Sequence, residues 1–217
     1  MTRALLLLAV LPAVLSPGVR AGEPPTRALQ EATQAYERGD LAAAREAMTR
    51  LSNAGVPAAD YNLAVMRLRG DMTRPSVPEA LRLMRRAADH GFVTAMFGLG
   101  RLYEDGEVVP ADLAQAHRWY LRAAEAGSVE AQVAVATAHY LGRGAAKDYA
   151  AAARWYREAA KGGDVGAQYL IASLYEAGDG VEHDLRLARY WYDLAARNGD
   201  EAAPGKVREI DAKLGAR

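Results

Sequence analysis

Three stretches of the chain decide the fold: AHRWYLRAAEAGSVEA at 116–131, AARWYREAAKGGDVGA at 152–167 and ARYWYDLAARNGDEAA at 188–203. Their tryptophans, Trp119, Trp155 and Trp191, lie 36 residues apart. Two weaker copies precede them, ALRLMRRAADHGFVTA at 80–95 and AREAMTRLSNAGVPAA at 44–59. A fixed period of about 20 to 50 residues is typical of a solenoid built from stacked repeats.

Each of these stretches has the pattern of an amphipathic helix. In the first one, Ala116, Trp119, Tyr120, Ala123 and Ala124 fall on one stripe, and charged side chains take the other face. We therefore expect the three tryptophans in the core. A glycine that follows each stretch favours the left-handed conformation that closes a helix. Side chains expected to cap helix N-termini are Asp112, Asp148, Asp184, Ser128 and Asp164.

A second helix is predicted ahead of each stretch. The three clearest examples read AMFGLGRLYEDG at 95–106, AQVAVATAHYLG at 131–142 and AQYLIASLYEAG at 167–178. The loop that joins the two helices has the same length in each unit. One helix hairpin cannot bury both apolar stripes alone, so neighbouring hairpins must stack. The sequence therefore predicts an all-α solenoid of stacked helix hairpins.

These positions resemble the Sel-one-like repeat (SLR) family, a relative of the tetratricopeptide repeat. The resemblance rests on Ala-x3-Leu-Gly-x2-Tyr-x2-Gly at 95–106, followed by Asp112, Trp119-Tyr120 and Gly127, and it covers about 58–203. It implies a right-handed, tetratricopeptide-like superhelix that scaffolds protein complexes through a concave face lined by the first helices. Val108 departs from the pattern, because Gly144 and Gly180 stand at its position in later units.

The expected organisation has four parts. Residues 1–21 form a signal peptide, and residues 22–57 form a linker and an N-terminal tetratricopeptide-like capping hairpin. Four 36-residue hairpins occupy 58–203, and a capping helix occupies 204–217. That last segment places Val207, Ile210 and Leu214 on one helical stripe, which suits a helix that covers the final hairpin.

The N-terminal segment predicts export. Arg3 precedes an apolar run of twelve residues from Ala4 to Leu15, and small residues follow up to Ala21. This run is too short to span a bilayer, which needs about twenty residues. We expect cleavage after Ala21, a periplasmic or secreted protein, and no membrane insertion after cleavage.

Composition argues against several classes of function. The chain holds 27 basic and 27 acidic residues without a basic cluster, which disfavours a nucleic-acid partner. It has no cysteine, so thiol nucleophiles and zinc–thiolate sites are excluded, together with any activity of the cysteine-rich branch of the resembled family. The four histidines lack metal-ligand spacing, and His139 takes a slot that holds Tyr103 and Tyr175 in other units. We predict a protein that is not an enzyme, with no catalytic, cofactor-binding or metal-binding residues.

A partner-binding surface should vary from unit to unit while the helical frame is kept. On the first helix of each hairpin, the variable positions predicted to bind a partner are Arg101, Glu104, Thr137, Tyr140, Ser173 and Glu176. A row of aromatic residues, Tyr61, Phe97 and Tyr169, belongs either to the core or to a groove. The function expected from the sequence is an exported, non-catalytic scaffold that binds another protein or peptide. The alternative is a peptidoglycan-binding or cell-wall-modifying enzyme, or a glycan binder.

Overall fold

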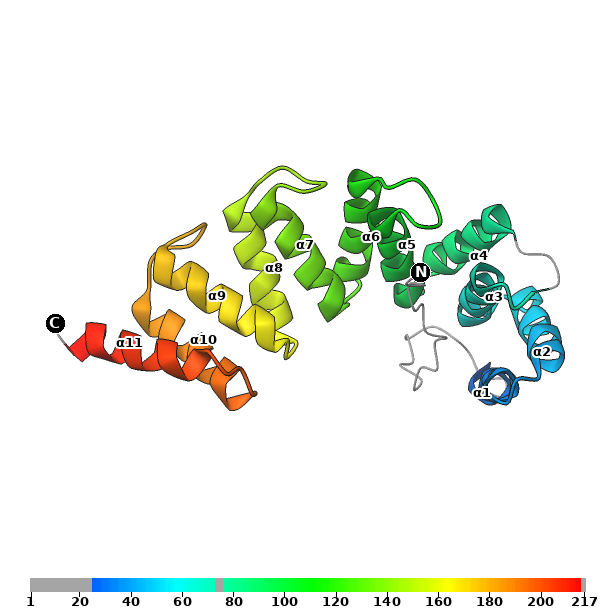
Figure 1. Ribbon diagram of the computed structural model, residues 1–217, viewed down its shortest axis with the longest axis horizontal. Helices are drawn as coiled ribbons and strands as arrows, with labels where there is room; N and C mark the ends of the chain where they lie inside the picture. Colours follow the sequence, from blue (N-terminus) through cyan, green and yellow to red (C-terminus); the bar gives the residue numbers. More distant parts are fainter. Residues whose placement is uncertain (1–24, 73–75, 216–217) are drawn as a thin grey trace. The chain divides into compact units, whose positions relative to one another are not determined.

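The computed structural model describes residues 25–72 and 76–215. Within these ranges the chain forms helices of 13 residues each and no strand (Figure 1). The predicted signal peptide and its cleavage position lie outside the described residues. The helices are α1 (Pro25–Glu37), α2 (Leu41–Asn53), α3 (Pro57–Arg69), α4 (Val77–Asp89), α5 (Val93–Asp105), α6 (Leu113–Glu125), α7 (Val129–Leu141), α8 (Tyr149–Lys161), α9 (Val165–Ala177), α10 (Leu185–Arg197) and α11 (Ala203–Gly215).

The chain divides into two compact units at Pro110. The first unit contains α1 to α5 and the second contains α6 to α11. Within each unit every helix packs against the next one along the chain, so consecutive helices form antiparallel hairpins that stack in chain order (Figure 1). The prediction of an all-α solenoid of stacked hairpins is confirmed.

The predicted helix ends are confirmed in detail. The side chains of Asp112, Asp148 and Asp184 accept hydrogen bonds from backbone N–H groups in the first turns of α6, α8 and α10. Ser128 and Asp164 cap α7 and α9 in the same way. These short polar side chains satisfy N–H groups that have no partner within the helix. The glycines that follow α6, α8 and α10 all take positive φ, as the sequence predicts: Gly127, Gly163 and Gly199.

Of the three tryptophans predicted to lie in the core, only Trp191 is buried, although Trp155 packs against the core of the second unit. Trp191 is 8% exposed, but Trp119 and Trp155 are only half-buried. Each neighbouring tyrosine, at 120, 156 and 192, is buried instead. Adjacent residues of a helix point in different directions, so both rings of a Trp-Tyr pair are buried only where neighbouring elements cover both directions, as they do for Trp191 and Tyr192 on α10. The Trp119 ring instead packs under the Arg122 guanidinium, whose carbon lies 4.5 Å from the ring centroid.

Two glycines let a loop lie directly on a helix start. Gly144, in the loop after α7, has φ of 74°, and a Cβ built there would lie 2.2 Å from the Leu113 backbone oxygen at the start of α6. Gly180, after α9, has φ of 67°, and its Cβ would lie 2.2 Å from the Tyr149 backbone carbon at the start of α8. Only glycine fits such a contact, so these positions fix how closely successive hairpins of the second unit stack.

A buried polar cluster joins three helices of the first unit. The Asp60 carboxylate on α3 is almost fully buried and accepts hydrogen bonds from Ser52 Oγ at 2.6 Å and Arg86 Nε at 2.6 Å. Arg86 also donates to Ser52 Oγ at 2.6 Å. In the second unit Gln168 takes the same repeat position, donating to the Ala160 carbonyl at 3.2 Å. Asp60 and Gln168 are therefore both buried at this repeat position, and different partners satisfy each of them, whereas Met96 is an apolar residue at the same position.

The helix α11 continues the repeat frame beyond α10. Ala203 lies 36 residues after Ala167, and both are fully buried. α11 packs against α10, and Ile210 is fully buried in the core of the second unit, with Val207 and Leu214 packed beside it. None of the helices in the described ranges is long and apolar enough to cross a membrane.

Candidate binding surface

The first two predicted partner-binding residues lie on α5 in the first unit. Arg101 is about half-exposed and forms an ion pair with Asp105, one helical turn later, at 3.4 Å. Glu104 is exposed on the same helix. A partly exposed ion pair of this kind is worth little to stability, so its side chains can rearrange around a partner at low cost.

Thr137 and Ser173 lie at equivalent positions on α7 and α9 of the second unit. The Thr137 and Tyr156 hydroxyls are 3.0 Å apart, and Ser173 hydrogen-bonds the Tyr192 hydroxyl. In both hairpins the tyrosine of the Trp-Tyr pair therefore reaches across to the first helix. These two hydroxyls hydrogen-bond the phenol oxygens of buried tyrosines, and they contribute less to an open surface than the sequence predicts.

Tyr140 belongs to an aromatic cluster that the sequence analysis missed. Its ring centroid lies 5.2 Å from that of Tyr149 at the start of α8, with the planes inclined at 56°. The Lys147 ammonium lies 4.8 Å from the Tyr149 ring centroid. The residues equivalent to Tyr149 in the flanking repeats are Leu113 and Leu185. Variation between repeats therefore also identifies Tyr149, once the second helix of each hairpin is included.

Glu176 is engaged by the C-terminal helix. Tyr192 donates to its carboxylate at 3.0 Å, and Lys213 of α11 donates at 2.7 Å. The Lys206 ammonium lies 3.5 Å away. Burial raises the pKa of Glu176, but the hydrogen bonds from Lys213 and Tyr192 and the two lysine charges outweigh burial and lower the pKa below its usual value. The structure therefore shows Glu176 as a contact that holds α11.

The three aromatic residues predicted to lie either in the core or in a groove, Tyr61, Phe97 and Tyr169, differ in their burial. Tyr61 is 2% exposed and belongs to the core of the first unit, where its ring packs 5.6 Å from Phe92. Phe97 and Tyr169 are half-buried. Tyr169 makes an edge contact with the Tyr192 ring at 5.0 Å. The second unit thus presents two partly open aromatic side chains on its first helices, Tyr140 on α7 and Tyr169 on α9, and both helices pack on α8.

Two histidines that are far apart in the sequence meet in the second unit. The His117 and His139 ring centroids are 5.0 Å apart in an edge-on arrangement. His139 Nδ1 lies 3.2 Å from the Ala146 carbonyl oxygen, and His117 Nδ1 is buried without a hydrogen-bond partner. Burial lowers the pKa of His117, and the neighbouring His139 and Arg118 lower it further. No group of three potential metal ligands occurs in the described parts of the chain.

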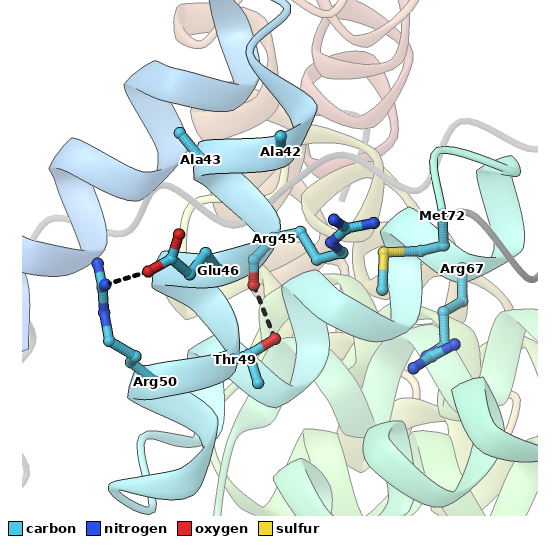
Figure 2. Close-up of a pocket in the computed structure, with 8 residues that line it drawn as sticks. All are labelled: Ala42, Ala43, Arg45, Glu46, Thr49, Arg50, Arg67 and Met72. Carbon is cyan, nitrogen blue, oxygen red and sulfur yellow. Dashed lines mark hydrogen bonds and ion pairs between the residues drawn. The ribbon is translucent and has the colours of Figure 1, made fainter.

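A cavity of about 630 Å³ lies in the first unit beside α2 (Figure 2). Its polar lining consists mainly of Arg45, Arg50, Arg67 and Glu46. Arg50 pairs with Glu46 at 2.7 Å, and Arg67 pairs with Glu79 at 2.9 Å. A guanidinium that already holds a carboxylate must give up that pair before it binds an acidic ligand, so this cavity is not favoured as the principal binding site.

The fold and its variable first-helix positions define a tandem-repeat protein of the scaffold class. The Sel1 repeat matches residues 57–92, 93–128, 129–164 and 165–200. The chain belongs to the Sel1 repeat family. Sel1 repeats commonly mediate interactions between proteins, and proteins of this family are generally non-catalytic.

Two solved structures resemble the chain over most of its length. One is c5321, described as a protective antigen present in uropathogenic Escherichia coli strains and displaying an SLR fold, with 34% identity over 73% of this chain and a TM-score of 0.66. The other is a Sel1 repeat protein from Oxalobacter formigenes, with 32% identity over 77% of this chain and a TM-score of 0.69. The matched regions cover 34% and 49% of those two proteins, so this chain spans only part of their length. No curated protein matches the chain.

Proposed function

We propose that this chain is an exported scaffold that binds another protein or peptide through the first helices of its repeats, without catalysis of its own. The observation that carries the proposal is the contrast between a strictly repeated frame and variable first-helix positions. Tyr140 and Glu176 stand 36 residues apart at one such position, yet one joins an aromatic cluster and the other an ion-pair cluster.

The chemistry of these positions suits a partner of mixed character. In the first unit, α5 offers the Arg101 guanidinium and the exposed Glu104 carboxylate. In the second unit, α7 offers the Tyr140 ring beside Tyr149 and Lys147. Tyrosine and arginine supply much of the binding energy in protein interfaces, because they combine a large contact area with directional polar groups. Arg101 and Tyr140 are therefore the residues expected to contribute most.

Export is proposed from the N-terminal sequence. A charged start, an apolar run of twelve residues and small residues before position 22 fit a secretory signal. A tagged chain should accumulate in the envelope or medium fraction with a new N-terminus at Gly22. Retention of Met1 in a cytoplasmic fraction would contradict export and would leave the binding proposal to be tested separately.

Crosslinking in cells tests the binding proposal. The tagged full chain should recover one abundant protein partner, and the double change Arg101→Ala with Tyr140→Ala should reduce that recovery by at least about tenfold. The matched control is Arg118→Ala with Arg154→Ala, which removes exposed side chains from the second helices α6 and α8. Equal loss in both double variants, or recovery of glycan fragments without a protein, would contradict the proposal.

A further inference from the structure

The helix α10 carries an apolar stripe on its outer face. Leu187 is 40% exposed and Tyr190 is 56% exposed, while Leu194 is partly buried. Their spacings of three and four residues place them on one side of the helix. Trp191 borders the stripe and is buried, with its ring 5.2 Å from the Tyr190 ring. Large apolar side chains aligned on an exposed helix face are typical of an interaction surface.

This stripe departs from the repeat. Tyr190 and Leu194 stand at positions that hold charged residues in all the remaining repeats. Leu187 stands at a position that holds a small or polar residue in the remaining repeats. The equivalents of Tyr190 are Arg82, Arg118 and Arg154; those of Leu194 are Arg86, Arg122 and Glu158; those of Leu187 are Glu79, Gln115 and Ala151. The repeat frame tolerates polar residues at all three positions. Leu194 also packs against the core of the second unit, whereas the exposed Leu187 and Tyr190 have no such role.

Two charges of opposite sign flank the stripe on the same side. Arg186 is exposed, and Asp193 lies seven residues later, which is two turns along the helix. Asp193 is partly exposed and pairs with Arg197 of its own helix at 2.6 Å. If two copies of α10 pack antiparallel through their stripes, Arg186 of each copy approaches Asp193 of the other. Parallel packing about a two-fold axis would place the charged edges of the two copies on opposite sides of the interface, where they do not pair. The flanking charges therefore favour the antiparallel arrangement.

We infer that α10 is the contact between two copies of this chain, which pair antiparallel about a two-fold axis near Tyr190. The contact is self-complementary, because the apolar stripe of one copy meets the same stripe of the other and each flanking arginine meets an aspartate. This surface lies on a second helix of the repeat, and the inference does not rest on the proposed binding role of the first helices.

Sedimentation velocity of the full tagged chain over a range of concentrations tests this inference, with circular dichroism to verify folding. We expect a reversible dimer. The double change Tyr190→Arg with Leu194→Glu should raise its dissociation constant by at least about tenfold, since it installs the pair that α8 carries at 154 and 158. Leu141→Glu is the control, because Leu141 is 52% exposed on α7 and outside the stripe. Dissociation should be unchanged in this variant.

A charge exchange tests the antiparallel orientation without touching the stripe. Arg186→Glu should weaken the dimer, and Arg186→Glu combined with Asp193→Arg should restore it. A chain that stays monomeric at every concentration would overturn the inference, and so would a dimer that persists in the Tyr190 and Leu194 variant. A monomer that loses a different protein partner in that variant would also overturn it, since the stripe would then bind a partner other than a second copy.

Discussion

At the scale of single residues, the Asp60 carboxylate depends on Arg86. Asp60 is 2% exposed and is held by Arg86 and Ser52. Removing the guanidinium leaves a buried carboxylate without its counter-charge, which costs several kcal/mol in comparable cases. We predict that Arg86→Ala lowers the free energy of unfolding by about 3 kcal/mol, measured by urea denaturation. Arg82→Ala is the control: Arg82 is exposed and 3.9 Å from Glu79, so an equal loss would contradict this account.

Gly180 tests the close contact between a loop and a helix start. Gly180→Ala combines positive φ with a Cβ placed 2.2 Å from the Tyr149 backbone. Gly163→Ala also has positive φ but meets nothing within 4 Å. We expect Gly163→Ala to cost about 1 kcal/mol from backbone strain alone. Gly180→Ala should cost roughly 3 kcal/mol, because the loop must also move away from α8. Similar melting temperatures for the two variants would contradict this prediction, because they would show that the loop can move away from α8 at little energetic cost.

The sequence predicts local features of this fold better than it predicts contacts across helices. Caps such as Asp148 and closing glycines such as Gly163 depend on neighbouring backbone atoms, so their spacing predicts them. How deeply each ring of a Trp-Tyr pair is buried depends on the facing helices. The sequence pattern places both Trp155 and Tyr156 on the apolar stripe, but Tyr156 is buried and Trp155 is only half-buried. His117 and His139 occupy different positions within the 36-residue repeat, so the periodicity of the sequence does not indicate their contact.

At the scale of elements, the attachment of α11 depends on Glu176. Replacing Lys206 and Lys213 by alanine removes both cations that contact this carboxylate. We predict faster amide hydrogen exchange throughout α11 in the double variant, while exchange in α7 is unchanged. Lys161→Ala, which removes an exposed ion pair with Glu158, is the control. Unchanged exchange in α11 would show that apolar contacts such as Ile210 suffice to hold it.

The same cluster predicts how α11 responds to acid. The pKa of Glu176 is lower in the folded chain than its unfolded value of 4.5, because Lys213, Tyr192 and Lys206 outweigh the effect of burial. The folded chain therefore binds fewer protons, and the stabilisation is present above pH 4.5 and lost as pH falls through the folded pKa. Glu176→Gln should remove this part of the acid sensitivity, measured as α11 exchange against pH. An unaltered profile would contradict the assignment.

The His117–His139 contact predicts a separate, milder pH effect. Burial, His139 and Arg118 make the pKa of His117 lower in the folded chain than the unfolded value of 6.5. The unfolded chain then binds more protons just below pH 6.5, so the free energy of unfolding decreases as pH falls through this window. His117→Gln should flatten this slope in urea denaturation, whereas exposed His183→Gln should not. A slope that survives His117→Gln would assign it to another group.

The sequence predicts the candidate site less completely than it predicts the helices that carry the site. Variation between repeats identified Tyr140, and the structure adds Tyr149 and Lys147 beside it. The same reasoning selected Glu176, because the difference between repeats at its position was attributed to binding of another molecule. The structure shows that α11 of the same chain supplies its contacts. Sequence variation marks a departure from the frame, but it does not say whether the compensating group belongs to this chain or to another molecule.

At the scale of the whole molecule, four Sel1 repeats give a protein many chemically distinct positions on one repeated frame. Buried alanines at the helix contacts, such as Ala88, Ala124 and Ala160, keep that frame constant while surface residues change. Stability in such an array is close to a sum over neighbouring repeats, so surface positions can change without unfolding the remainder. This separation is what lets one fold serve as a scaffold for a specific partner.

The most direct test of the proposed function compares the two kinds of helix in one experiment. Tyr140 on α7 and exposed Arg118 on α6 are replaced, in separate strains, by an aromatic photo-crosslinking residue. Irradiated cells should give a crosslink to another protein from position 140 and none from position 118. A ring at position 140 preserves the packing on Tyr149, so the site itself should remain folded. Equal crosslinks from both positions, or none from position 140, would contradict a partner site on the first helices.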